Sequence, residues 1–311
     1  MKKQFVKSAI ATAVMGVALV AAGSAVAGIA NTKHNLGSAG TGPNHVAETG
    51  EICVFCHTPH GGDIGTTGAP VAVPLWNKKL SAATFTTYDQ LGTSTLDAAI
   101  STIGSVTLAC LTCHDGTQAI DNIRNAPGSG GFDATGGGAT GLAWTWTSTD
   151  KTLDANGAFQ GSVDGGGTNI WAIGTDLRND HPVSVQYAGG GYSATNLNAA
   201  GGTRDSDFFP ALLVSPGVAR WYVDNTTMSG VEGGLPNAFD KWDFKLYTRV
   251  GAGTSANGAT FASGGASEPF VECGSCHDPH METTTFLRIS TLNGARASND
   301  SSRVCLTCHN K

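Results

Sequence analysis

The chain has 311 residues, of which 43 are Gly and only 14% are charged, whereas about 7% Gly and about 25% charged residues are usual in globular proteins. This composition argues for long loops held by something other than a large aliphatic core. Lys and Arg total 18 against 24 Asp and Glu, which gives a net charge of −6. Because no basic run is present, the electrostatic footprint of a nucleic-acid-binding protein is missing, and we exclude nucleic acids as partners.

Residues 1–27 have the pattern of a secretory signal peptide. Three lysines precede an apolar run over residues 9–22, and Ala25-Val26-Ala27 offers a cleavage site of small residues. A transmembrane anchor is the alternative, but the apolar run is shorter than the roughly 20 residues that span a bilayer. We therefore expect an exported protein without a transmembrane segment, located outside the cell or at its surface, with the periplasm as the alternative.

All eight cysteines fall into four C-x-x-C-H motifs. The motifs comprise Cys53, Cys56 and His57; Cys110, Cys113 and His114; Cys273, Cys276 and His277; and Cys305, Cys308 and His309. This is the attachment motif of c-type haem, in which both thiols bond to the porphyrin and the histidine binds the iron. A disulfide framework or a zinc ribbon would explain the cysteine pairs, but not the histidine after every pair. The sequence therefore predicts four covalently bound c-type haems.

Five further histidines are candidates for the opposite face of each haem iron: His34, His45, His60, His181 and His280. Methionine is a poor alternative, because only Met228 and Met281 remain once residues 1–27 are removed. The supply of histidine therefore allows every haem to have histidine on both faces.

Two of these histidines follow a motif histidine by three residues, in His57-Thr58-Pro59-His60 and in His277-Asp278-Pro279-His280. Three residues span at most about 10 Å, which is too short to pass around a porphyrin to its other face. His60 and His280 must therefore each serve the haem of a different motif. The simplest pairing gives His60 to the haem of His114, and His280 to the haem of His309.

His34, His45 and His181 then remain for the haems of His57 and His277. His181 is followed by Pro182, which favours extended backbone, and preceded by an aspartate that could orient its ring. His34 and His45 lie near the start of the exported chain, on an arm that is mobile unless it is tied down. Either could bind a haem of its own chain or of a neighbouring subunit.

The motifs divide the exported chain into an N-terminal di-haem unit over 28–125, a Gly-rich insert over 126–265 and a C-terminal di-haem unit over 266–311. The alternating stretch 142–147 within the insert is typical of a short strand. We expect a loop-rich multihaem cytochrome c with little regular secondary structure. Short helices are expected at the haem motifs and in segments such as 91–103, and the insert should be small and contain β-strands.

Several segments resemble those of the exported multihaem c-type cytochromes of metal-reducing bacteria, especially the filament-forming tetrahaem members. These are Lys33-His34-Asn35-Leu36, residues 52–60, Pro74-Leu75-Trp76-Asn77, residues 110–116 and Asp180-His181-Pro182-Val183. The resemblance implies an extracellular filament with a continuous chain of bis-histidine haems and one ligand contributed across the subunit boundary. It also implies ligand roles for His34, His60, His181 and His280, with His45 either surplus or donated to the next subunit.

An iron with histidine on both faces has no open position for a substrate, so we expect electron transfer and not enzymatic catalysis. The main expectation is an extracellular electron conduit. Its partners would be further copies of the chain, redox partner cytochromes and extracellular acceptors such as metal oxides. A monomeric periplasmic electron shuttle and a multihaem reductase with one open iron are the alternatives.

Overall fold

The computed structural model describes residues 28–63, 73–93, 102–136, 141–149, 152–163, 167–189, 205–215, 218–225, 239–240, 242–248, 269–283, 285–289 and 303–310. The expected signal peptide over 1–27 lies outside these residues. Within them, no helix has the length and apolar character needed to cross a bilayer.

The α-helices in the described part of the chain are short, and each contains cysteines of a C-x-x-C-H motif. They are α2 (Ser105–His114), α3 (Cys273–Cys276) and α4 (Arg303–Leu306), and the first motif contains the 3-10 helix η2 (Cys53–Phe55). The other 3-10 helices are η1 (Gly28–Asn31), η3 (Tyr88–Leu91) and η4 (Tyr187–Gly189). The loop-rich fold with short helices at the motifs therefore agrees with the expectation.

The helix expected over 91–103 is wrong where the structure describes that segment. The 3-10 helix η3 ends at Leu91, because Gly92 adopts a left-handed conformation with φ 64° and its N–H bonds back to the carbonyl of Asp89. The next helix of the described residues, α2, begins at Ser105. Residues 94–101 of the expected helix lie outside the described residues.

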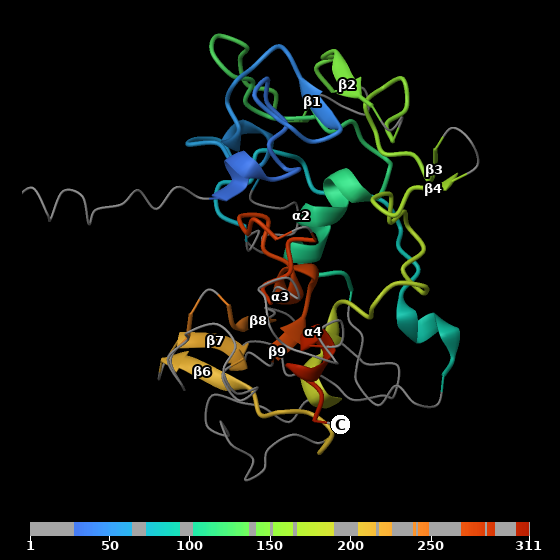
Figure 1. Cartoon of the computed structure of the whole chain (residues 1–311), viewed down its shortest axis with the longest axis vertical. Helices are drawn as coiled ribbons and strands as arrows, with labels where there is room; N and C mark the ends of the chain where they lie inside the picture. The colour runs from blue at the N-terminus through green and yellow to red at the C-terminus, as the bar shows by residue number, and fades with distance from the viewer. Residues whose placement is uncertain are drawn as a thin grey trace, which may run out of the picture.

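A five-stranded antiparallel sheet has the strand order β5-β9-β8-β7-β6 (Figure 1). Its strands are β5 (Val185–Gln186), β6 (Leu212–Ser215), β7 (Val218–Val223), β8 (Phe244–Thr248) and β9 (Pro269–Val271). Strand β9 leads directly into the third motif at Cys273. The sheet thus joins strands of the Gly-rich insert to the segment that carries this motif.

Two smaller antiparallel pairs complete the strands of the described residues. They are β1 (Asn44–Val46) with β2 (Trp146–Ser148), and β3 (Ser162–Val163) with β4 (Gly167–Thr168). The strand expected over 142–147 therefore begins only at Trp146. Before it, Ala143 has a left-handed φ of 55°, and the N–H of Trp144 donates to the carboxylate of Asp121 instead of a neighbouring strand.

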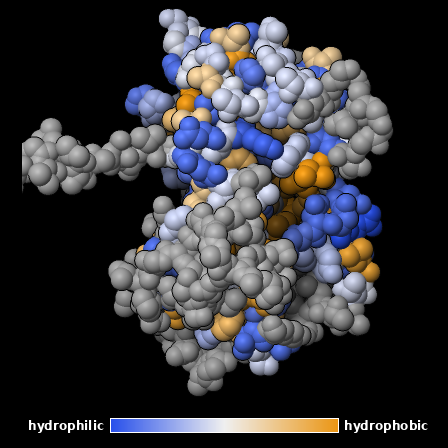
Figure 2. Space-filling model, viewed as in Figure 1, coloured by the Kyte–Doolittle hydropathy of each residue, from blue (hydrophilic) through white to orange (hydrophobic). Residues whose placement is uncertain are grey.

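Two separate hydrophobic clusters support the motifs. In the first, Trp221 and Phe244 of the five-stranded sheet are buried, and Cys276 and Cys308 pack against the cluster. In the second, buried Phe55 packs with strand β1 and Ile123, and Cys56 lies at its edge. The cysteines of three motifs are thus part of the packed interior. Figure 2 shows further apolar surface in a recess near the middle of the molecule.

Asp243 makes stability depend on pH. It precedes β8 and is 1% exposed, and burial raises its pKa to about 6. A raised folded-state pKa means that its stabilising contribution is complete below about pH 4 and is lost as the pH rises through about 6. As the pH rises from about 4 to above 6, the free energy of unfolding of Asp243→Asn should therefore increase relative to that of the wild type by at most about 3 kcal/mol.

Thermal unfolding of both proteins at several pH values between about 4 and 7 measures this difference. Asp176→Asn is the control, because hydrogen bonds from Arg178 lower the pKa of this exposed carboxyl to about 2. The same pH dependence in both variants would contradict the assignment to Asp243.

Candidate functional site

The first three C-x-x-C-H motifs, which are far apart in the sequence, lie next to one another. Burial, together with the nearby thiol of Cys113, raises the pKa of the Cys56 thiol to about 12. The thiols of Cys110 and Cys273 are hydrogen-bonded, which raises the pKa of Cys110 and lowers that of Cys273. The second motif therefore lies near the first at Cys113 and is hydrogen-bonded to the third at Cys110.

The fourth motif continues this series. Burial raises the pKa of the Cys308 thiol, and the nearby Cys276 of the third motif raises it further. Figure 1 shows the helices of the last three motifs, α2, α3 and α4, following one another through the middle of the molecule. The four motifs are thus arranged in space in the same order as in the sequence.

A buried polar network fixes α2 against α3. Glu272 is 2% exposed and immediately precedes the third motif; its carboxylate accepts hydrogen bonds from Thr107 Oγ1 at 2.5 Å and Ser184 Oγ at 3.0 Å. The N–H of Cys273 donates to Thr107 Oγ1 at 3.1 Å. Because these hydrogen bonds satisfy the carboxylate, it can be buried between the second and third motifs.

A cavity lies between the third and fourth motifs. Its lining includes Cys276, Cys305, Cys308, His309, His181 and Phe208. Thiols and imidazoles thus face a space whose other walls are largely apolar and aromatic. These are the donors and the surroundings that a covalently attached haem requires, so the residues present fit this group.

Three motif histidines have the tautomer that metal binding requires. The Nδ1 atoms of His57, His114 and His277 lie 2.8, 2.7 and 2.8 Å from the carbonyl oxygens of Pro74, Trp171 and Thr285, respectively. A carbonyl oxygen can only accept, so each Nδ1 carries the hydrogen. The lone pair then resides on Nε2, as in metal-binding histidines oriented by a backbone carbonyl.

Two of the additional histidines face motif histidines at the same distance. The ring centroids of His57 and His280 are 6.2 Å apart with an interplanar angle of 14°. Those of His34 and His114 are also 6.2 Å apart, with an angle of 68°. Metal–imidazole bonds are about 2.0–2.1 Å long and the ring centre lies roughly 1.1 Å beyond the nitrogen, so two imidazoles on opposite sides of one metal have centroids about 6.3 Å apart. Both pairs have this separation.

His181 lies near the third motif. Burial lowers the pKa of His277, and the charges of Arg288 and His181 lower it further. The ring of His181 is exposed, and its Nδ1 lies 3.0 Å from the carbonyl oxygen of Pro182. A third motif histidine therefore has an additional histidine close to it.

These neighbours differ from the pairing expected from the sequence. The sequence pairs His280 with the haem of His309 and His60 with that of His114, whereas the structure places His280 next to His57, and His34 next to His114. The expectation kept each pair within one di-haem unit. Because α3 packs on α2, the turn after His277 reaches back to the first motif instead. The argument that His280 cannot serve its own motif agrees with this position.

The N-terminal segment is tied to the turn after the third motif. The side-chain amide of Asn31 donates to Glu282 at 3.0 Å, and the ring of His34 stacks on Phe286 with centroids 4.1 Å apart. Burial, together with the nearby His114, lowers the pKa of His34 to about 3. His34 is therefore neutral, which is the form that binds a metal.

His45 and His60 lie elsewhere. The half-buried His45 is in β1 opposite Thr147, and its Nδ1 lies 3.1 Å from the carbonyl oxygen of Gly42. The exposed His60 is in a turn whose backbone is fixed: its carbonyl accepts hydrogen bonds from Asn125 Nδ2 at 2.6 Å and from Thr58 Oγ1 at 2.8 Å.

Lys78 is a residue of the site that the sequence did not indicate. Its side chain is fully buried, and Nζ donates to the carbonyl oxygens of Ala119, Ile120 and Asn122 at 3.4, 2.7 and 3.0 Å. Burial lowers its pKa, whereas the nearby Cys113 and Cys56 raise it. The run Asn77-Lys78-Lys79 looks like a solvated loop, so no local signal could have found it.

Comparison with known proteins identifies the C-terminal pair of motifs. Residues 268–311, which contain the third and fourth motifs, match the doubled CXXCH motif family. No curated protein matches the chain. The CXXCH motifs indicate covalently bound c-type haem, and the match supports a protein like the multihaem c-type cytochromes, with a role in electron transfer.

Lys78→Met should destabilise the protein strongly, because three buried carbonyl groups lose their donor. We expect a loss of about 3–5 kcal/mol in the free energy of unfolding, measured by denaturant titration of the haem-loaded protein. Lys79→Met is the matched control, because Lys79 is exposed and its replacement should change stability by about 0.5 kcal/mol or less. Equal effects of the two substitutions would show that the buried ammonium group is dispensable.

Proposed function

We propose that the protein is an electron-transfer protein with four covalently bound c-type haems, each bound by histidine on both faces. We further propose that it forms the repeating subunit of a conductive filament outside the cell. The observation that carries the proposal is the 6.2 Å separation in each of two imidazole pairs, which fits one metal ion between the rings. Bound haem iron would supply a one-electron couple, and two imidazoles would leave it no position for a substrate.

The proposed ligands follow from the neighbouring histidines. His57 and His280 would bind the haem of the first motif, His114 and His34 that of the second, and His277 and His181 that of the third. His309 would bind the haem of the fourth motif. Because three of the five additional histidines are then assigned, His45 and His60 remain as candidates for its second ligand.

The order of the motifs supports conduction. Each junction between consecutive motifs brings cysteines of both together, at Cys56 and Cys113, at Cys110 and Cys273, and at Cys276 and Cys308. Haems attached at these positions would form one uninterrupted series of redox centres. A protein that only stored electrons would not need such a series, whereas a conductor requires it.

The surroundings of His60 support a contact between subunits. Leu75 and Phe132 are 54% and 55% exposed. Phe132 lies over Gly61, and the backbone of Leu75 lies against Gly62, so two residues with exposed apolar side chains flank the turn that carries His60. We propose that this turn docks on a second copy of the chain and that His60 completes its fourth haem. His60 would then take the bridging role that the sequence suggests for His34 or His45. His45 remains the alternative bridging residue.

Replacing His34 tests the ligand assignment. In His34→Ala, one haem in four should become high-spin and bind carbon monoxide, because the iron of the second motif loses a ligand. The wild type and His45→Ala should stay low-spin, with intact mass still giving four haems in each protein. Carbon monoxide binding by the wild type would favour a reductase, and a mass without haem adducts would contradict the whole proposal.

Replacing His60 tests the filament. His60→Ala should retain four haems but fail to form filaments in negative-stain microscopy of material shed from the cell surface, whereas His45→Ala should still polymerise. The reverse result would move the bridge to His45. Filaments from both variants would contradict a histidine bridge, and a wild type that stays monomeric in the periplasm would favour the electron shuttle.

A further inference from the structure

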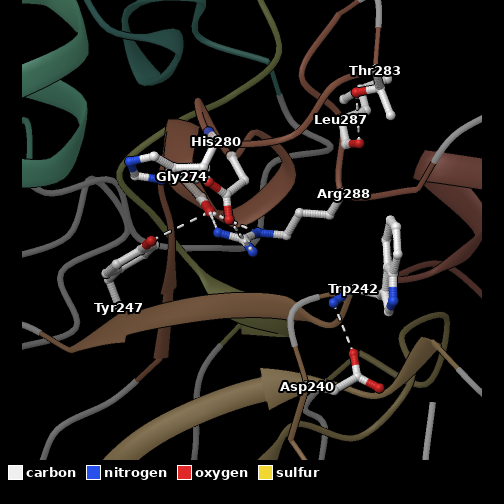
Figure 3. Close-up of polar contacts among 9 residues, drawn as sticks. Asp240, Trp242, Tyr247, Gly274, His280, Thr283, Leu287 and Arg288 are labelled. Carbon is white, nitrogen blue, oxygen red and sulfur yellow. Dashed lines mark hydrogen bonds and ion pairs between the residues drawn. The ribbon is translucent and has the colours of Figure 1, made fainter. Parts of the chain in front are cut away.

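A buried arginine connects the third motif to the carboxylate that follows it. Arg288 is 3% exposed, and its Nε and Nη2 atoms both donate to the carbonyl oxygen of Gly274 at 3.2 Å. Its Nη1 donates to Asp278 Oδ2 at 3.1 Å. Figure 3 shows the guanidinium group directed at the Gly274 carbonyl, to which the hydroxyl of Tyr247 also donates at 3.3 Å. Gly274 lies between the two cysteines of the third motif, so the arginine is fixed to the attachment loop itself.

Asp278 in turn holds the ring of His280. Its Oδ1 atom accepts hydrogen bonds from the backbone N–H of His280 at 3.0 Å and from the ring Nδ1 at 3.1 Å. The backbone of Asp278 is also fixed, because its N–H donates to the carbonyl of Phe286 at 2.7 Å. The carboxylate therefore selects the tautomer of His280 that keeps its lone pair on Nε2, and it restricts rotation of the ring whose centroid lies 6.2 Å from that of His57.

This partner differs in kind from those of the motif histidines. The rings of His57, His114 and His277 each donate to a neutral backbone carbonyl, whereas the ring of His280 donates to a carboxylate. A charged acceptor makes the imidazole a stronger electron donor to its metal and stabilises the higher oxidation state. The carboxylate, although paired with Arg288 through its other oxygen, therefore acts through the His280 ring on the metal that His280 would bind.

We propose that Asp278, held in place by Arg288, is a positioning residue that lowers the reduction potential of the haem attached to the first motif. The inference rests on the proposed function, because it takes His57 and His280 as the two ligands of that haem. Asp278 is the direct neighbour of His277 in the sequence, and the sequence alone would place its influence on the haem of the third motif. The structure assigns the effect to a motif more than 200 residues away.

The test is a potentiometric titration of the four-haem protein, followed by electron paramagnetic resonance. The shape of a low-spin ferric haem signal depends on the angle between its two imidazole planes. The 14° pair of His57 and His280 should therefore give a different signal from the 68° pair of His34 and His114. His280→Met identifies the signal of the first pair, because that signal should disappear.

In Asp278→Asn, the amide oxygen can still accept from His280 without the charge. The signal of the His57 and His280 pair should remain low-spin, and its reduction should become about tenfold more favourable, a rise of about 59 mV for one electron. Asp278→Glu should restore part of the difference. Asp176→Asn is the matched control, because Asp176 forms an exposed ion pair with Arg178 at 2.7 Å, and it should leave all potentials unchanged.

A shift confined to another haem, or no shift at all, would overturn the inference, while four low-spin haems in the same sample would leave the proposed function intact. If Asp278→Asn does not accumulate, the same measurement is made on Arg288→Lys. This variant keeps the positive charge but loses the two hydrogen bonds to the Gly274 carbonyl. The potential of the same haem should then rise and its signal should broaden. An unchanged signal and potential in Arg288→Lys would equally overturn the inference.

Discussion

The packing of α2 on α3 is the constraint on which the rest of the site depends. It places the second motif against the third, although 158 residues lie between His114 and Cys273, and it brings the turn after His277 to the first motif. A hydrogen bond from the hydroxyl of Thr107 to the buried carboxylate of Glu272, 2.5 Å long, holds this junction. Without it, the second motif would lose its direct contact with the third. With it, four attachment points form one series.

A chain this rich in Gly and poor in charge has a small aliphatic interior, and its two hydrophobic clusters reflect this. Each cluster packs against cysteines of the motifs, so the interior continues into the attachment sites instead of standing apart from them. Covalently attached, flat apolar groups would complete this interior and restrict the unfolded chain, which offsets the entropy that long loops lose on folding. The polar groups that are buried, such as Lys78, are correspondingly well satisfied.

The sequence predicts what depends on short-range pattern. The four motifs, the short helices at them and the loop-rich fold follow from residue spacing and composition. What it missed depends on contacts between distant segments: His280 reaches His57 only because of the α2–α3 junction, and Arg288 becomes a site residue only by folding over Gly274. At the described start of the helix expected over 91–103, the difference has a local cause, since Gly92 at φ 64° ends the preceding turn. The sequence does not reveal this left-handed conformation, because glycine adopts positive and negative φ about equally readily.

Two fixed charges of opposite sign lie at the N-terminal side of the series. The ammonium group of Lys78 has three carbonyl acceptors for its three hydrogens, an arrangement that suits the protonated form, and it lies near Cys56 and Cys113. Asp278 places a carboxylate on His280, the neighbour of His57, and this carboxylate is itself paired with Arg288 at 3.1 Å. A redox centre at the first motif would therefore lie near an ammonium group and a carboxylate–guanidinium pair. The polypeptide thus makes neighbouring positions electrostatically unequal, and haems bound there would have unequal reduction potentials.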